Sequence, residues 1–137
     1  MTARDLLALG ISYAYILFVL GFAEALRARL KYSPDFTRKV IHVSVGSWIV
    51  PTFFLFDSAL AALIPPLSFV FLNSLALKKG WFRSMKIQSE GDWGTVYLPL
   101  SFVFLIALTW NTPYRFATAV GLLMLAWGDA SAALAGR

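Results

Sequence analysis

Apolar residues run through this chain in five long stretches, separated by short polar segments. The stretches cover residues 6–26, 36–56, 59–77, 95–110 and 114–137. A helix needs about 20 predominantly apolar residues to cross a bilayer core, and most of these stretches have that length. The pattern therefore predicts an all-α fold, a polytopic transmembrane helix bundle with about five spans.

Proline and turn residues mark breaks within this pattern. Ser33, Pro34 and Asp35 form a turn with a helix cap ahead of the second stretch. Pro51 is expected to kink that stretch, because proline lacks the amide hydrogen that an α-helix needs. The pair Pro65–Pro66 removes two such donors from the third stretch, which predicts a kinked or broken helix.

Composition supports the membrane interpretation. Of the 137 residues, 59% are hydrophobic and 14% are charged, which leaves too little polar surface for a soluble globule of this size. The net charge of +5 does not indicate nucleic-acid binding, because the basic residues lie in short loops between apolar stretches. No cysteine and no internal repeat are present, so residues 1–137 are expected to form a single transmembrane domain.

The distribution of basic residues predicts the orientation in the membrane. The first and third loops contain Arg27, Arg29, Lys31, Arg38, Lys39, Lys78, Lys79, Arg83 and Lys86. The positive-inside rule places these loops in the cytosol, which puts the N-terminus outside and the C-terminus in the cytosol. We therefore expect a multi-pass integral membrane protein, in the plasma membrane if the source is bacterial. Its most polar segments, 38–42, 89–95 and 129–137, then converge on the cytosolic face.

Three residues at the start of the second stretch fall on one helical face. Arg38 and His42 are four residues apart, and Lys39 and His42 are three apart. Arginine, lysine and histidine on one face are suited to phosphate binding and proton transfer. The alternative is that Arg38 and Lys39 are positive-inside anchors and that His42 is a satisfied interfacial histidine.

The segment before the fourth stretch combines acids with glycines. Glu90 and Asp92 are carboxylates that could hold Mg²⁺ together with substrate phosphates, and Gly94 and Thr95 follow them. Glycines let backbone amides approach an anion closely. The alternative is a solvated turn followed by a helix cap at Thr95.

Asp129 is the residue that stands out most clearly, because it lies inside an otherwise apolar stretch. A charge within a membrane helix indicates a functional site by default. The choices are an internal partner such as Arg38, a proton or ion pathway, or a metal ligand at a nucleotide site. Gly128, Ala132 and Gly136 recur around it at every fourth position, a pattern typical of closely packed membrane helices.

These segments together resemble a known enzyme family. The resemblance rests on Glu24, on Arg38-Lys39-Val40-Ile41-His42 with Gly46, on Glu90 followed by Gly94-Thr95-Val96-Tyr97-Leu98-Pro99-Leu100-Ser101, and on Gly128-Asp129-Ala130-Ser131-Ala132 with Gly136-Arg137. Their order and spacing look like those of the phytol kinase, dolichol kinase and CTP-dependent diacylglycerol kinase family, relatives of the phosphatidate cytidylyltransferases.

The resemblance implies an enzyme that transfers the terminal phosphate of CTP, or of another nucleoside triphosphate, to the hydroxyl of a membrane lipid alcohol with Mg²⁺. Transferred by motif position, Asp129 and His42 become the catalytic residues, and Asp129 and Glu90 the metal ligands. Asp129 as the base for the lipid hydroxyl remains an alternative. The phosphate-binding residues implied are Arg38, Lys39, Gly94, Thr95, Gly128, Gly136 and Arg137.

Two other functions remain open from the sequence. One is a cytidylyltransferase that attaches the nucleotide to a phospholipid, and the other is a non-catalytic membrane protein whose polar residues serve helix packing. Members of the resembled family usually continue past the segment that matches Gly136-Arg137. We therefore expect the N-terminal part of a longer protein, or a truncated relative. A homo-oligomer is also an open expectation, because a second copy of the chain would cover the polar faces of the five spans.

Overall fold

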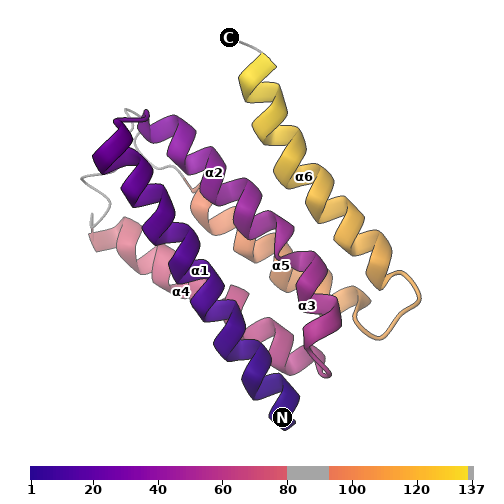
Figure 1. The fold of residues 1–137 in the computed structure, drawn as a ribbon. Coiled ribbons are helices and arrows are strands. Elements are labelled where there is room, and N and C mark those ends of the chain that lie inside the picture. Colours follow the sequence, from indigo (N-terminus) through magenta and orange to yellow (C-terminus); the bar gives the residue numbers. More distant parts are fainter. Residues whose placement is uncertain (80–92, 136–137) are drawn as a thin grey trace.

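The computed structural model describes residues 1–79 and 93–135, and this part of the chain forms helices with no strand (Figure 1). The helices are α1 (Ala3–Leu30), α2 (Pro34–Ser47), α3 (Ile49–Leu55), α4 (Ala59–Lys79), α5 (Gly94–Thr109) and α6 (Arg115–Ala135). The all-α fold expected from the sequence is confirmed for these residues. Two of the helices, α1 and α4, are long and apolar enough to cross a membrane. The number of five spans stays a prediction.

Helices α1, α2, α4, α5 and α6 run in alternating directions, and α3 continues in the direction of α2, so that the two chain ends lie at opposite ends of the bundle (Figure 1). α4 packs mainly against α5, and α2 packs against both α6 and α1. This path brings the C-terminal ends of α1, α4 and α6 to the same end as the N-terminal ends of α2 and α5. We call this the α2–α6 end.

The N-terminus of α1 is fastened to the turn before α4 by a buried carboxylate. Asp5 is fully buried and forms a capping box with Thr2, in which each side chain accepts the other residue's backbone N–H. It also accepts hydrogen bonds from the backbone amides of Asp57 (2.9 Å) and Ser58 (3.3 Å) and from the Ser58 hydroxyl (3.2 Å). A buried carboxylate with this many donors is stabilised rather than left isolated. Asp5 therefore has a structural explanation.

The second apolar stretch divides into α2 and α3, as Pro51 predicts. A proline lacks the amide hydrogen for the residue four positions earlier and its ring collides with that carbonyl. For Pro51 this residue is Ser47, the last residue of α2. α3 then starts at Ile49 without a side-chain cap. The kink expected from Pro51 is observed as an interruption of the helix between Ser47 and Ile49.

The proline pair in the third stretch has a milder effect. Pro65 and Pro66 lie inside α4, which continues from Ala59 to Lys79 as one helix. The Ser68 hydroxyl donates a 2.7 Å hydrogen bond to the Pro65 carbonyl and so caps one backbone group near the prolines. The sequence predicted either a kinked or a broken helix here, and the prediction of a broken helix is wrong. The neighbouring helices α1 and α5 both pack against α4.

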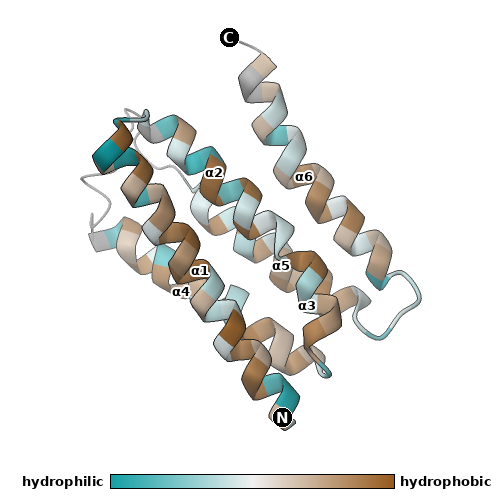
Figure 2. Cartoon of the chain, viewed as in Figure 1, coloured by the Kyte–Doolittle hydropathy of each residue, from teal (hydrophilic) through white to brown (hydrophobic). Residues whose placement is uncertain are grey.

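The buried core is built mainly from α3, α5 and α6, with contributions from α1 and α4. Ile49, Ile106 and Leu122 are fully buried there, and the ring of Phe53 packs at 5.3 Å from that of Trp110. Outside this core many large apolar side chains are exposed, and Figure 2 shows that hydrophobic residues make up much of α1, α3 and α4. Exposed apolar surface of this extent is typical of a protein that contacts a membrane or a partner.

Candidate functional site at the α2–α6 end

The basic residues of α2 are held by an acid one turn earlier. Arg38 Nη2 lies 3.1 Å from Asp35 Oδ1, and Lys39 Nζ lies 2.7 Å from Asp35 Oδ2. The Lys39 side chain is only 12% exposed, so its ammonium is held more firmly than that of a free surface lysine. Arg38 and Lys39 thus lie together at the start of α2, where arginine and lysine side chains can bind an anion such as phosphate.

His42 is positioned one turn further along α2, on the side that faces α6. It is half-buried, and its Nε2 atom is buried with no hydrogen-bond partner within residues 1–79 and 93–135. Buried polar atoms are nearly always hydrogen-bonded, so an unpartnered one needs an explanation. A substrate-binding or proton-transferring role supplies one. The alternative of a satisfied interfacial histidine does not fit the described residues.

Asp129 lies on α6, across from this part of α2. The charges of Asp129 and Arg38 are both close enough to act on His42. The Asp129 carboxylate is exposed and makes no ion pair or hydrogen bond with the residues that the structure describes. Of the three alternatives for Asp129, an ion pair with Arg38 is therefore not found among the described residues. Asp129 remains free to bind a ligand.

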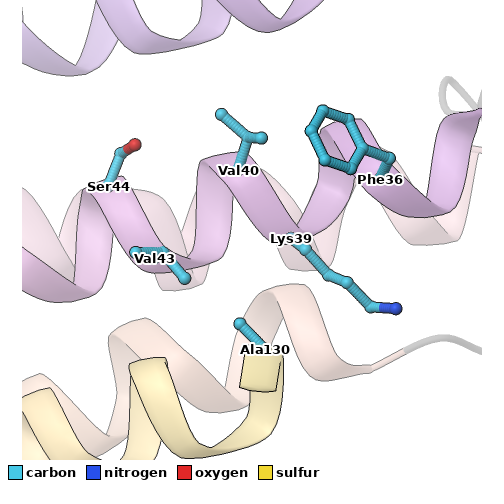
Figure 3. Close-up of a pocket in the computed structure, with 6 residues that line it drawn as sticks. All are labelled: Phe36, Lys39, Val40, Val43, Ser44 and Ala130. Atoms are coloured by element: carbon cyan, nitrogen blue, oxygen red, sulfur yellow. The ribbon is translucent and has the colours of Figure 1, made fainter. Parts of the chain in front are cut away.

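A small hollow adjoins these residues between α2 and α6 (Figure 3). It has a volume of about 230 Å³ and is lined by Phe36, Lys39, Val40, Val43, Ser44 and Ala130. Among the described residues that line it, Lys39 is the only charged one, and the other lining side chains except Ser44 are apolar. The hollow therefore has one charged border and a largely apolar wall.

The start of α5 contributes Gly94 and Thr95 to the same end of the bundle (Figure 1). Thr95 is exposed, and its backbone carbonyl accepts a 2.8 Å hydrogen bond from the Asn73 side chain of α4. α5 begins at Gly94 with Trp93 as its N-cap, so the alternative of a helix cap at Thr95 is wrong. α5 packs against α4 and α6, whereas α2 packs against α1 and α6. Gly94 and Thr95 thus share an end of the bundle with His42, and their role in phosphate binding stays a prediction.

Three residues expected in the site lie outside the described residues, namely Glu90, Gly136 and Arg137. Within the described residues, no group of three or more His, Cys, Asp or Glu side chains could hold a metal ion. Mg²⁺ is commonly bound by one or two carboxylates together with waters and substrate phosphates. The free carboxylate of Asp129 fits that kind of site, in which the substrate completes the coordination.

The packing face of α6 differs from the one expected. Gly128 is exposed, and a Cβ added there would meet nothing within 4 Å. Ala126 and Ala130 are buried instead, and they face α2 two residues out of phase with the Gly128 and Ala132 pattern. For the described residues, the predicted close-packing role of Gly128 is therefore wrong. The exposure of Gly128 leaves the backbone beside Asp129 accessible.

Aromatic contacts that sequence reasoning missed fix α2 against α1. The rings of Tyr15 and Trp48 stack with their centroids 4.1 Å apart. Trp48 Nε1 donates to the hydroxyl of the fully buried Ser12, and the Tyr15 hydroxyl donates to the Ser44 carbonyl. A single serine such as Ser12 within an apolar stretch carries little sequence signal by itself. These bonds position α2, and with it His42, relative to α1.

Comparison with curated proteins finds one similar protein. The chain is 27% identical over 132 residues to a phytol kinase from Synechocystis sp., in an alignment that covers 96% of this chain and 56% of that protein. This chain is similar to a phytol kinase. It spans about half the length of the curated relative that it matches. No family model matches the chain, and no solved structure matches it.

The similarity to phytol kinase supports a kinase-type transferase and, with the two apolar helices, a membrane protein. The expected relation to phytol kinases is confirmed at this level. A closer relation to dolichol or diacylglycerol kinases stays a prediction, as does the expected truncation.

Proposed function

We propose that the α2–α6 end carries the phosphoryl-transfer site of a lipid-alcohol kinase. The observation that carries the proposal is the free carboxylate of Asp129, which lies within electrostatic reach of the unpartnered His42. Two cations, Arg38 and Lys39, border the same site. Phosphoryl transfer needs positioning and charge neutralisation more than covalent chemistry, and these groups can provide both. The similarity to a phytol kinase supports this class of reaction.

In the proposed reaction, the hydroxyl oxygen of the lipid alcohol attacks the γ-phosphorus of CTP. The bond from that phosphorus to the oxygen bridging the β- and γ-phosphates breaks, and CDP leaves. His42 Nε2 accepts the hydroxyl proton, since it is the ring nitrogen without a partner in the described residues. Lys39 and Arg38 neutralise charge on the phosphates.

Asp129 is the carboxylate proposed to hold Mg²⁺ together with the phosphates of the nucleotide. Bound there, Mg²⁺ would supply charge neutralisation at the transferring phosphoryl group. The exposure of Asp129 leaves space for a nucleotide, and the neighbouring Gly128 adds no side chain that would obstruct it. Glu90 is proposed as a second ligand on the grounds of the sequence resemblance alone.

We further propose that the bundle crosses the membrane about five times and that the α2–α6 end faces the cytosol. The basic residues Arg27 and Arg29 at the end of α1 favour this orientation under the positive-inside rule. α1 has 28 residues and a length of about 42 Å at 1.5 Å per residue, which exceeds a hydrocarbon core of about 30 Å. Its charged ends therefore extend into the headgroup regions, where a nucleotide and a lipid hydroxyl can meet.

The reaction class is tested with labelled nucleotide. Membranes containing the full chain are incubated with a long-chain isoprenoid alcohol and CTP labelled either in the γ-phosphate or in the α-phosphate. Transfer of label to lipid from the γ position alone supports the kinase. Transfer from the α position alone indicates the cytidylyltransferase, and no transfer by well-folded protein favours the non-catalytic membrane protein. Either of these two results would overturn the proposal.

A further inference from the structure

The hollow between α2 and α6 lies directly beside the proposed catalytic residues. Its lining residue Ala130 immediately follows Asp129 on α6, and two of its lining residues, Lys39 and Val43, flank His42 on α2. In Figure 3, Lys39 and Val43 extend toward α6 and Ala130 points back toward α2, whereas Phe36, Val40 and Ser44 extend to the other side of α2. His42 and Asp129 do not line the hollow themselves, but on each helix the proposed catalytic residue is next in the chain to a lining residue.

The wall of this hollow changes character along its length. At one border, the Lys39 ammonium is held 2.7 Å from Asp35. The remaining wall consists of apolar groups and the Ser44 side chain, and the Ser44 backbone carbonyl is already bonded to the Tyr15 hydroxyl at 3.0 Å. A ligand that fits such a wall carries a polar head and an apolar body. A nucleotide alone does not meet this description, because its base and sugar are polar.

The size of the hollow limits what it can hold. Its volume of about 230 Å³ is below the roughly 300–1,000 Å³ of sites that enclose a whole small ligand. The hollow is open, so a chain lying in it can continue outward along the surface. It therefore suits the first part of a long apolar chain.

We propose that this hollow, lined by Phe36, Lys39, Val40, Val43, Ser44 and Ala130, holds the part of the lipid alcohol's apolar chain that lies next to its hydroxyl group. The inference rests on the proposed function and adds the location of the acceptor substrate. With the chain beside Ala130 and Val43, the hydroxyl comes next to Asp129 and His42. The alcohol enters sideways between α2 and α6.

The hollow acts mainly by orienting the chain. A lipid chain in the bilayer is already in apolar surroundings, so moving it into an apolar groove adds little hydrophobic free energy. Orientation of the reacting group can nevertheless raise a rate strongly. We therefore expect this groove to determine which alcohols react, through the shape of the chain close to the hydroxyl.

The first experiment fills the groove and compares two acceptors. Val40→Trp adds bulk to the groove wall, and the matched control Val120→Trp adds the same bulk at an exposed position of α6. We expect Val40→Trp to lower kcat/KM for a long-chain isoprenoid alcohol by about tenfold or more, and to change the value for a short-chain alcohol much less. Val120→Trp should leave both values near those of the unmodified protein. Equal losses for both acceptors in folded Val40→Trp protein would overturn the inference.

A second measurement does not depend on activity or on the folding of a bulky variant. A photoreactive amino acid replaces Val40 or Val120 in the full chain, and radiolabelled long-chain alcohol is added without nucleotide. Labelling at position 40 should saturate and be competed by unlabelled alcohol, whereas labelling at position 120 should rise linearly as it does for bulk lipid. Linear labelling at both positions would overturn the inference.

The two proposals fail in different ways. Saturable labelling at position 40 without any transfer from CTP would support the groove and contradict the kinase function. Transfer from the γ position together with linear labelling at position 40 would support the kinase and contradict the groove.

Discussion

Gly46 of α2 packs against Ala126 of α6 so closely that no Cβ fits between them. Gly46 lies four residues after His42, and Ala126 lies three residues before Asp129. This contact therefore sets the separation of α2 and α6 one turn away from the two proposed catalytic residues. Small residues allow such close approach of helices, which is how helices associate where apolar solvent offers no hydrophobic driving force.

Enlarging Gly46 should separate the two helices. Gly46→Ala is expected to destabilise the fold by about 1–3 kcal/mol through overpacking, and to lower activity more than stability alone would explain. Gly121→Ala in α6 is the matched control, because a Cβ there meets nothing within 4 Å. Thermal unfolding in detergent and transfer from CTP measure the two effects. Equal behaviour of the two variants would contradict the close contact.

Removing the charge of Asp129 should abolish transfer and leave the fold intact. Because this side chain is exposed and makes no ion pair with the described residues, Asp129→Asn should not change the midpoint of thermal unfolding. Transfer from CTP is expected to fall by about 100-fold or more, the size of effect seen when one transition-state-stabilising group is lost. Asp57→Asn makes the same change at the opposite end of the bundle. Near-normal activity of Asp129→Asn would show that the site is assigned wrongly.

The protonation of His42 is expected to determine how kcat depends on pH. A histidine that accepts a proton must be neutral, so activity should fall as the pH drops and the ring becomes protonated. His42→Gln keeps a polar group of similar reach and cannot accept a proton in this way. We expect a loss of about 100-fold and disappearance of the acidic limb from the residual activity. Retention of that limb would assign the titrating group elsewhere.

Asp5 should affect stability and not catalysis. Its carboxylate joins Thr2 to Asp57 and Ser58 at the end of the bundle opposite the proposed site. Asp5→Asn removes the charge that these donors stabilise, so the midpoint of thermal unfolding should fall by several degrees. The activity of the remaining folded protein should be unchanged. A specific loss of kcat without a change in unfolding would point to a functional role for this end.

The orientation of the bundle can be tested by cysteine labelling, because the chain contains no cysteine. Ser33→Cys lies before α2 at the α2–α6 end, and Asn111→Cys lies in the turn between α5 and α6 at the other end. A membrane-impermeant thiol reagent should label Asn111→Cys from outside intact cells, and Ser33→Cys only after the cytosolic side is opened. The reverse result would invert the proposed topology.

Sequence reasoning located most helices because the apolar stretches and their proline breaks are local features. The division between α2 and α3 follows from Pro51 acting on the Ser47 carbonyl. Sequence reasoning also predicted that polar ends of α2, α5 and α6 lie together, because helices joined by short loops alternate in direction. It missed Asp5, although Thr2 with an acid three residues later is a capping signal.

The roles of the two acids depended on tertiary structure. Sequence reasoning singled out Asp129 because it lies inside an apolar stretch, and it assigned no role to Asp5. Only the packing shows that Asp5 is buried among donors and that Asp129 is exposed without a partner in the described residues. The difference arises from which helix ends meet, and this is a long-range property.

The sequence by itself determined that the chain is helical and apolar, where proline interrupts it, and which end of the bundle collects the polar residues. Only the tertiary structure decided that α6 turns Ala126 and Ala130 toward α2, and not Gly128. A helix that is apolar on most sides carries little information about its rotation, because lipid-facing and buried positions both accept the same residues. The contact between Gly46 and Ala126 fixes that rotation, and with it the position of Asp129 relative to His42.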